Sequence, residues 1–270
     1  MLDGLRRDEQ CLEQSADYQR VVIWSEFDCY DQLTLLRLLA HYAAHRVPPR
    51  LELINVGAFP GAVRFIGLGQ LPPEALRLLW STRQAVTASQ LSLGLAGWKA
   101  LAHPDPRPLA GILGGGTPAL PLLAPALHRH LRELPSLENG LGFTQQQALS
   151  LLASGPHSLN RIFGRLTYEL DPLPGQGDAQ MRDRVLPLGE VDSPLFTRRP
   201  GIDREGRARP PWTDVLHLTD RGLAVLRGEA DFMSQRPPSR WVGGVEVAPG
   251  QPDWRWDEQR RAAVLKPARD

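Results

Sequence analysis

The sequence contains few cysteines, no long apolar run and no signal-peptide pattern. Its two cysteines, Cys11 and Cys29, are too few for a disulfide framework or a cysteine metal cluster, which fits a reducing compartment. No run approaches the roughly 20 apolar residues needed to span a bilayer. Residues 1–9 also lack the apolar core of a signal peptide. The sequence therefore predicts a cytoplasmic protein without a membrane partner.

Lysine is also scarce, because Lys99 and Lys266 are the only lysines among 31 basic residues. A GC-rich genome explains this arginine bias more simply than a need for bidentate anion contacts does. The net charge of +1 gives no global reason to bind nucleic acid or a membrane. The apolar share of 42% and the charged share of 23% are typical of a folded globular protein, so a packed core is expected.

Residues 1–57 are expected to form a partial α/β unit. An apolar, β-branched run at 20–25 predicts a strand that is buried on both faces of a sheet. The apolar positions of 32–45 lie on one broad helix face, and a second strand is predicted at 51–56. Strand, helix and strand make a parallel βαβ unit, but two strands do not make a stable sheet alone. We therefore expect a homo-oligomer that completes the sheet, or a preceding portion of the chain.

Residues 58–141 are expected to be a helical region with loops. Thr87 and Gln90 have the spacing of a capping box at the start of a helix. Pro118 is expected to open a further helix. The three glycines at 114–116 neither follow a strand nor have the spacing of a phosphate loop, so we interpret them as a linker.

Residues 142–235 have the pattern of a winged-helix-like α+β domain. Its expected elements are a helix opened by a capping box at 144–147, a helix capped by Ser158, a helix at 179–186, a hairpin of strands 195–198 and 215–218, and a helix capped by Thr219. Helix, helix, helix and hairpin is the usual order of a winged helix. Residues 236–270 are expected to form a C-terminal hairpin tail that packs Trp254 and Trp256.

Three carboxylates, Glu26, Asp28 and Asp31, follow the first predicted strand and open the next helix. Ligands of open α/β sheets bind at the carboxyl ends of the strands. One interpretation, which we favour, makes Asp28 the helix N-cap and places Asp31 at the positive end of the helix dipole. The other makes all three the oxygen ligands of a divalent cation that activates water or clamps a phosphate. In that case His130 is a further candidate catalytic residue.

Arginines offer the candidate contacts to nucleic acid or to another anion. His128 and His130 point to different sides of a helix, so we expect Arg129 and His130 at a polar contact between domains or at an anionic ligand. The candidate contacts are Arg129, Arg182, Arg184, Arg198 and Arg199. Acidic residues nearby offset much of their charge, and DNA affinity depends largely on phosphate neutralisation. We therefore expect weak nucleic-acid binding, or a protein-binding role.

Short stretches between residues 24 and 256 carry a family resemblance. They are WSEFDCYDQL at 24–33, GLGQL at 67–71, RQAVT at 83–87, RHLRELPS at 129–136, NGL at 139–141, RWVGGV at 240–245 and WRW at 254–256. Together they resemble a bacterial family catalogued as domain of unknown function 1835. The resemblance implies an architecture rather than an activity. Family members usually carry histidine where this chain has Phe27, and further N-terminal strands, so it implies an N-terminally shortened member.

Two functions from different classes follow. The first is a binding or regulatory protein whose winged-helix-like module contacts protein or nucleic acid, with the α/β part as a sensor or dimer platform. The alternative is a metal-assisted hydrolase or transferase at the carboxylate cluster. The enzyme requires the three carboxylates close together, open to solvent and facing Arg129 or His130. The binding protein requires the arginines of the hairpin on one exposed face, clear of the acidic residues.

Overall fold

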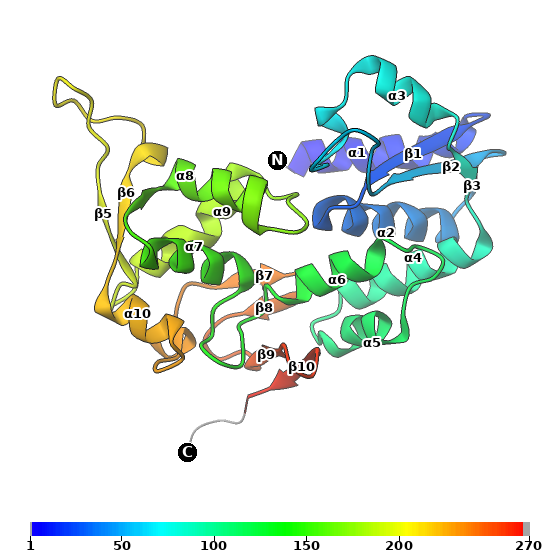
Figure 1. Ribbon diagram of the computed structural model, residues 1–270. Coiled ribbons are helices and arrows are strands. Elements are labelled where there is room, and N and C mark those ends of the chain that lie inside the picture. The colour runs from blue at the N-terminus through cyan, green and yellow to red at the C-terminus, as the bar shows by residue number, and fades with distance from the viewer. Residues whose placement is uncertain (1, 267–270) are drawn as a thin grey trace. The chain divides into compact units, whose positions relative to one another are not determined.

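Two units make up the chain in the computed structural model, which describes residues 2–266 (Figure 1). Unit 1 comprises the residues up to Ala100 together with Gly115–Ala126, and unit 2 comprises Leu101–Gly114 and the residues from Leu127 onward. Both contain helices and strands, so the fold is mixed α/β, as predicted. The finer boundaries at residues 57, 141 and 235 stay predictions. No described helix combines the length and the apolar character required to cross a membrane.

The sheet of unit 1 contains the predicted βαβ arrangement. Strands β1 (Val21–Glu26) and β2 (Leu51–Val56) pair in parallel, and helix α2 (Cys29–Ala44) connects them. A third strand, β3 (Gln84–Ala85), adds antiparallel to β2, which gives the order β1-β2-β3. The expectation of only two strands was therefore wrong. This strand has two residues, both exposed, so it has no apolar period that a sequence pattern can detect.

Helices cover one face of this sheet and an aromatic cluster covers the other. Helix α4 (Ala88–Leu101) packs against α2 so closely that a Cβ atom built on Gly94 lies 2.3 Å from the Leu39 Cβ atom. On the opposite face, Trp24 of β1 stacks on Trp80, with ring centroids 6.4 Å apart. Helices α1 (Leu2–Gln14) and α3 (Pro73–Trp80) and the 3-10 turns η1 (Ser15–Asp17) and η2 (Leu68–Gln70) complete the part of unit 1 before α4.

The segment that follows α4 differs in part from the prediction. Helix α5 (Arg107–Gly115) includes Gly114 and Gly115, so two of the three glycines are helical rather than a linker, and Gly116 ends the helix with a φ of 79°. Helix α6 (Leu123–Leu131) begins five residues after Pro118. The Thr117 hydroxyl donates to the Leu120 carbonyl at 3.0 Å, which stabilises a turn where the helix was expected to open.

The centre of unit 2 is an α+β arrangement around a buried apolar core. Its elements are α7 (Phe143–Ala153), β4 (His157–Ser158), α8 (Leu159–Arg165), η3 (Leu166–Leu170), α9 (Asp178–Val185), η4 (Leu186–Gly189), β5 (Phe196–Arg199), η5 (Pro211–Thr213), β6 (Val215–Leu218) and α10 (Asp220–Leu226). The three strands form an antiparallel sheet in the order β4-β6-β5. Leu149, Ile162 and Leu216 are fully buried in the core that joins the helices to this sheet.

Two of the three predicted helix caps in this part are confirmed. The Ser158 hydroxyl accepts from the Arg161 amide, and the Thr219 hydroxyl accepts from the Gly222 amide. The capping box at 144–147 was wrong, because α7 begins at Phe143 and the Gln145 side chain accepts from the Gly142 amide at 3.0 Å. Thr144 is instead buried and donates its hydroxyl to Glu133 at 2.5 Å.

The C-terminal part forms two hairpins rather than the predicted one. After the 3-10 turn η6 (Phe232–Gln235), β7 (Arg240–Val242) pairs with β8 (Val245–Val247), and β9 (Trp254–Asp257) pairs with β10 (Ala262–Leu265). Trp254 and Trp256 are buried, as predicted. The Trp256 amide donates to the Pro135 carbonyl at 2.8 Å, which ties this hairpin to the segment after α6.

Candidate functional site

The three carboxylates at the end of β1 each accept a hydrogen bond from a backbone amide. Asp28 is the N-cap of α2 and accepts from the Asp31 amide at 2.8 Å, which confirms the favoured interpretation. Asp31 accepts from the Glu26 amide at 2.7 Å, and Glu26 accepts from the Leu68 amide at 2.6 Å. The three side chains therefore join β1 to α2 and to η2, and their oxygens are used within the fold.

Glu26 lies in a tight and partly buried position. A Cβ atom built on Gly67 lies 2.2 Å from one Glu26 carboxylate oxygen, so the chain there requires glycine, whose φ is 150°. Burial raises the pKa of Glu26 above its usual value, the Leu68 amide lowers it, and the charges of Asp31 and Asp28 raise it further. Burial, the largest cause, therefore makes the charged form of Glu26 less favourable than in a free side chain.

These positions do not support the interpretation as a divalent-cation site. Within residues 2–266, no group of three or more histidine, cysteine, aspartate or glutamate side chains has an arrangement that could hold a metal ion. His130, the fourth candidate catalytic residue, belongs to unit 2, whereas Glu26, Asp28 and Asp31 belong to unit 1. The alternative function as a metal-assisted hydrolase or transferase stays a prediction.

Gln32, which the sequence analysis missed, connects the two parallel strands. This side chain is fully buried, and its amide nitrogen donates to the Ser25 hydroxyl at 3.1 Å and to the Asn55 side-chain oxygen at 2.9 Å. It also donates to the Glu26 carbonyl. A polar residue one position after Asp31 gave no signal of this role, because the sequence does not show which helix face meets the strands.

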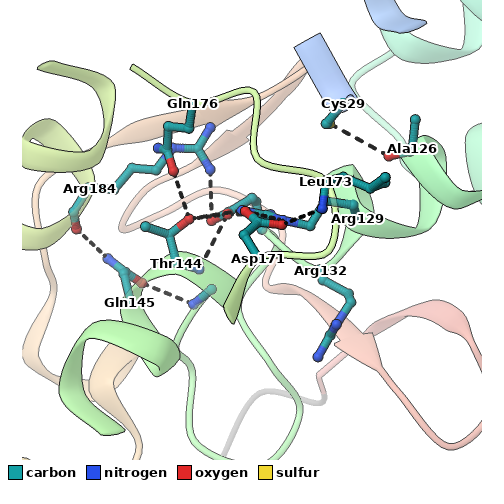
Figure 2. Close-up of polar contacts among 12 residues, drawn as sticks. Cys29, Ala126, Arg129, Arg132, Thr144, Gln145, Asp171, Leu173, Gln176 and Arg184 are labelled. Atoms are coloured by element: carbon teal, nitrogen blue, oxygen red, sulfur yellow. Dashed lines mark hydrogen bonds and ion pairs between the residues drawn. The ribbon is translucent and has the colours of Figure 1, made fainter. Parts of the chain in front are cut away.

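Arg129 lies inside unit 2, at the centre of a buried network (Figure 2). Its guanidinium pairs with Glu133 at 2.6 Å, one helical turn away, and with Asp171 at 2.8 Å. It also donates to the Thr144 hydroxyl at 3.2 Å. Burial alone would lower the pKa of Arg129, but Glu133 and Asp171 raise it above its usual value. Two buried carboxylates thus occupy the Arg129 guanidinium, and its contact with an external anion stays a prediction.

Three further basic side chains surround Glu133. Arg184 of α9 pairs with Glu133 at 2.7 Å. Burial lowers the pKa of His130 to about 4, helped by the charge of Arg184, so its imidazole is neutral near pH 7. Burial also lowers the pKa of Arg240 to about 10, although Glu133 acts in the opposite direction. Burial alone would raise the pKa of Glu133. The charges of Arg184 and Arg129 lower this pKa by more, so it lies well below its usual value.

A cavity of about 410 Å³ lies elsewhere in unit 2, beside Phe143 and Trp256. Four of its five charged lining groups pair with one another, since Arg132 lies 3.5 Å from Glu258 and Arg260 lies 3.0 Å from Asp257, and the fifth is Glu138. The Arg132 guanidinium also lies over the Phe143 ring, 4.4 Å from its centroid. Glu138 is therefore the one charged lining group without an ion pair among the described residues, and no basic side chain in the lining is left to bind an anion.

The arginines of the β5–β6 hairpin divide into paired and exposed residues. Arg198 pairs with the buried Asp214 at the base of the hairpin, and Arg207 pairs with Asp203 and Glu205 at its tip. Three others are exposed and form no ion pair with a described residue. They are Arg199, Arg204 and Arg209.

Helix α9 offers less positive charge than the hairpin does. Arg182 is partly exposed and has no ion pair in the described part of the chain. Arg184 is held by Glu133, and the same helix exposes Asp178 and Asp183. Of the five predicted anion contacts, Arg182 and Arg199 are thus the two that form no ion pair with a described residue.

The comparisons with known proteins found no match: no family model, no curated protein and no solved structure matches the chain.

Proposed function

We propose that unit 2 contains a winged-helix-like module that binds the phosphate backbone of nucleic acid. The order of α7, β4, α8 and α9, followed by the β5–β6 hairpin, supports this fold. So does the sheet order β4-β6-β5, in which the first short strand pairs with the last. In modules of this kind a helix contacts the duplex. Here that helix is α9 and the wing is the β5–β6 hairpin.

The exposed arginines of the wing are the observation that carries the proposal. The loop between β5 and β6 extends beyond the helices of unit 2 (Figure 1). From residue 198 to residue 214 it contains five arginines and three carboxylates, so it is locally basic in a nearly neutral chain. The Asp214 carboxylate accepts from the Gly201 amide at 3.1 Å and fixes the base of the loop. Arg199, Arg204 and Arg209 are therefore presented to solvent on a defined hairpin.

The same geometry supports weak binding without strong sequence preference. Phosphate contacts supply sequence-independent affinity, whereas side chains that reach base edges supply specificity. Helix α9 offers one unpaired arginine, Arg182, beside exposed carboxylates. The proposal therefore assigns to the module a regulatory or architectural role in which it contacts the phosphates of the nucleic acid.

A charge-removal experiment tests this proposal. Arg199→Ala, Arg204→Ala and Arg209→Ala are combined in one variant, and binding to a fluorescent DNA duplex is followed by anisotropy. The control variant combines Arg46→Ala, Arg50→Ala and Arg77→Ala, which removes three exposed arginines from unit 1. We expect a large loss of affinity in the wing variant and little change in the control. Equal losses in both variants would show that net charge alone is responsible.

Two broader expectations remain proposals. Membership of the domain of unknown function 1835 family is supported by where the similar stretches lie, since Arg129, Glu133 and Arg240 all belong to one buried network of unit 2. In this proposal the similar stretches preserve the interior of unit 2. The role of unit 1 as a sensor or dimer platform is supported by the open edge of β1, which no other described strand covers.

A further inference from the structure

We propose that the surroundings of Glu133 in unit 2 form a binding site for a phosphate group, held by Arg184 and Arg240 beside His130. The site is separate from the wing and does not depend on nucleic-acid binding. Arg184 comes from α9, Arg240 from β7 and His130 from α6, so three elements distant in sequence supply the donors.

The first argument is the balance of charge in the network. Its members include three guanidinium groups, those of Arg129, Arg184 and Arg240, and two carboxylates, those of Glu133 and Asp171. Buried charges are stable when they are paired. One positive charge is therefore left over among these groups, and a bound anion would balance it.

The second argument is a donor without an acceptor. The Arg240 Nη2 atom is buried and has no hydrogen-bond partner among the described residues. Native structures leave few buried polar groups unsatisfied, and such exceptions often mark a missing ligand or water. What this site lacks is an acceptor, which an anion supplies.

The third argument is that the donors are close together and reachable. A Cβ atom built on Gly142 lies 3.0 Å from a Glu133 carboxylate oxygen and 3.2 Å from Arg240 Nη2, so Arg240 lies next to Glu133. The charge of Arg184 acts on both His130 and Arg240. About one third of the Arg184 side chain is exposed, at 33%, so this donor is reached from solvent.

The chemistry of the donors selects the ligand. Guanidinium groups present planar pairs of N–H donors that match the oxygens of a phosphate. The neutral imidazole of His130 adds one N–H donor. A phosphate group fits whether it is free or the end of a phosphomonoester, because the site needs only its oxygens and negative charge.

Nuclear magnetic resonance of His130 in the full chain tests the proposal directly. Inorganic phosphate is added while sodium chloride is reduced to hold the ionic strength constant, and a second series uses O-phosphoserine. Bound phosphate should shift the His130 resonances saturably and raise its pKa from about 4, because a negative charge favours the imidazolium. A response to O-phosphoserine alone would identify a phosphomonoester as the ligand.

Thermal unfolding of matched variants gives a second readout. Ligands that bind the native state raise the melting temperature by mass action. Phosphate should raise it in the wild type and in the surface control Arg227→Gln, but not in Arg240→Gln. His130 resonances that respond no more to phosphate than to chloride would overturn the proposal, even if Arg240→Gln fails to fold. An equal stabilisation of Arg240→Gln would also overturn it.

Discussion

Several single carboxylates in this chain accept hydrogen bonds from backbone amides. Asp28, Asp31 and Glu26 each accept from one amide, and Asp214 accepts from the Gly201 amide. A free amide at a helix N-terminus or loop needs an acceptor, and a short acidic side chain is well placed to supply one. An acidic cluster next to a strand therefore has a structural explanation as well as a catalytic one.

Replacing Asp28 tests this explanation. Asp28→Ala removes the N-cap of α2 and should lower the free energy of unfolding by roughly 1 kcal/mol. Asp28→Asn is the matched control, because asparagine caps helices about as well as aspartate and should restore most of the stability. Urea denaturation measures both variants. Unchanged stability in Asp28→Ala, together with loss of divalent-cation binding, would favour the metal site instead.

His130 gives the protein a predictable pH dependence. Its folded pKa of about 4 lies below its usual value of 6.5, so the unfolded chain takes up a proton first as the pH falls. The stability is therefore fully present above about pH 6.5 and is lost progressively down to about pH 4, by at most about 3 kcal/mol. His130→Gln should reduce the loss measured by urea denaturation between these pH values. The same loss in His130→Gln and in the wild type would contradict this assignment.

At the scale of elements, alanine substitutions at two helical glycines are expected to change the stability in opposite directions. Gly94→Ala places a Cβ atom 2.3 Å from the Leu39 Cβ atom, so α4 must move away from α2. Overpacking of this kind costs roughly 1–3 kcal/mol. Gly111→Ala in α5 meets nothing within 4 Å and should instead stabilise the helix by up to about 1 kcal/mol. Equal effects of the two substitutions in urea denaturation would show that α2 and α4 are not in close contact.

The elements that the sequence predicted well are those with a strong local signal. The apolar period and the limits of β1, α2 and β2 come from residues that are near one another in the chain. The hairpin of β5 and β6 and the caps Ser158 and Thr219 are local in the same way. Strand β3 and the start of α7 were missed because distant residues decide them. Strand β3 forms by pairing with β2. The Thr144 hydroxyl donates to Glu133 and therefore does not cap the helix.

The candidate site was less predictable than the fold for the same reason. Arg129 appears available in the sequence, and only folding places Asp171, 42 residues later, against its guanidinium. Arg240 lies 107 residues beyond Glu133 in the sequence, yet the two are neighbours in unit 2. Position in the chain therefore shows which residues are charged, but not which charges are already paired.

At the scale of the whole molecule, the open edge of β1 predicts self-association. Edge strands with unpaired backbone groups pair readily with another chain. Both faces of the sheet are covered within unit 1, so we expect association through the edge alone. Light scattering over a range of concentrations should detect a dimer. A stable monomer at high concentration with cooperative two-state melting would contradict this prediction.

The salt dependence of DNA binding tests the central proposal most directly. The association constant of the wild-type protein is measured for two duplexes of unrelated sequence, from about 50 mM to about 200 mM salt. If the wing contacts phosphates, the logarithm of this constant falls linearly with the logarithm of the salt concentration, by roughly 0.9 per phosphate neutralised. Both duplexes should give the same line. Binding that survives the higher salt with a strong preference for one duplex would contradict the account, as would no binding at the lower salt.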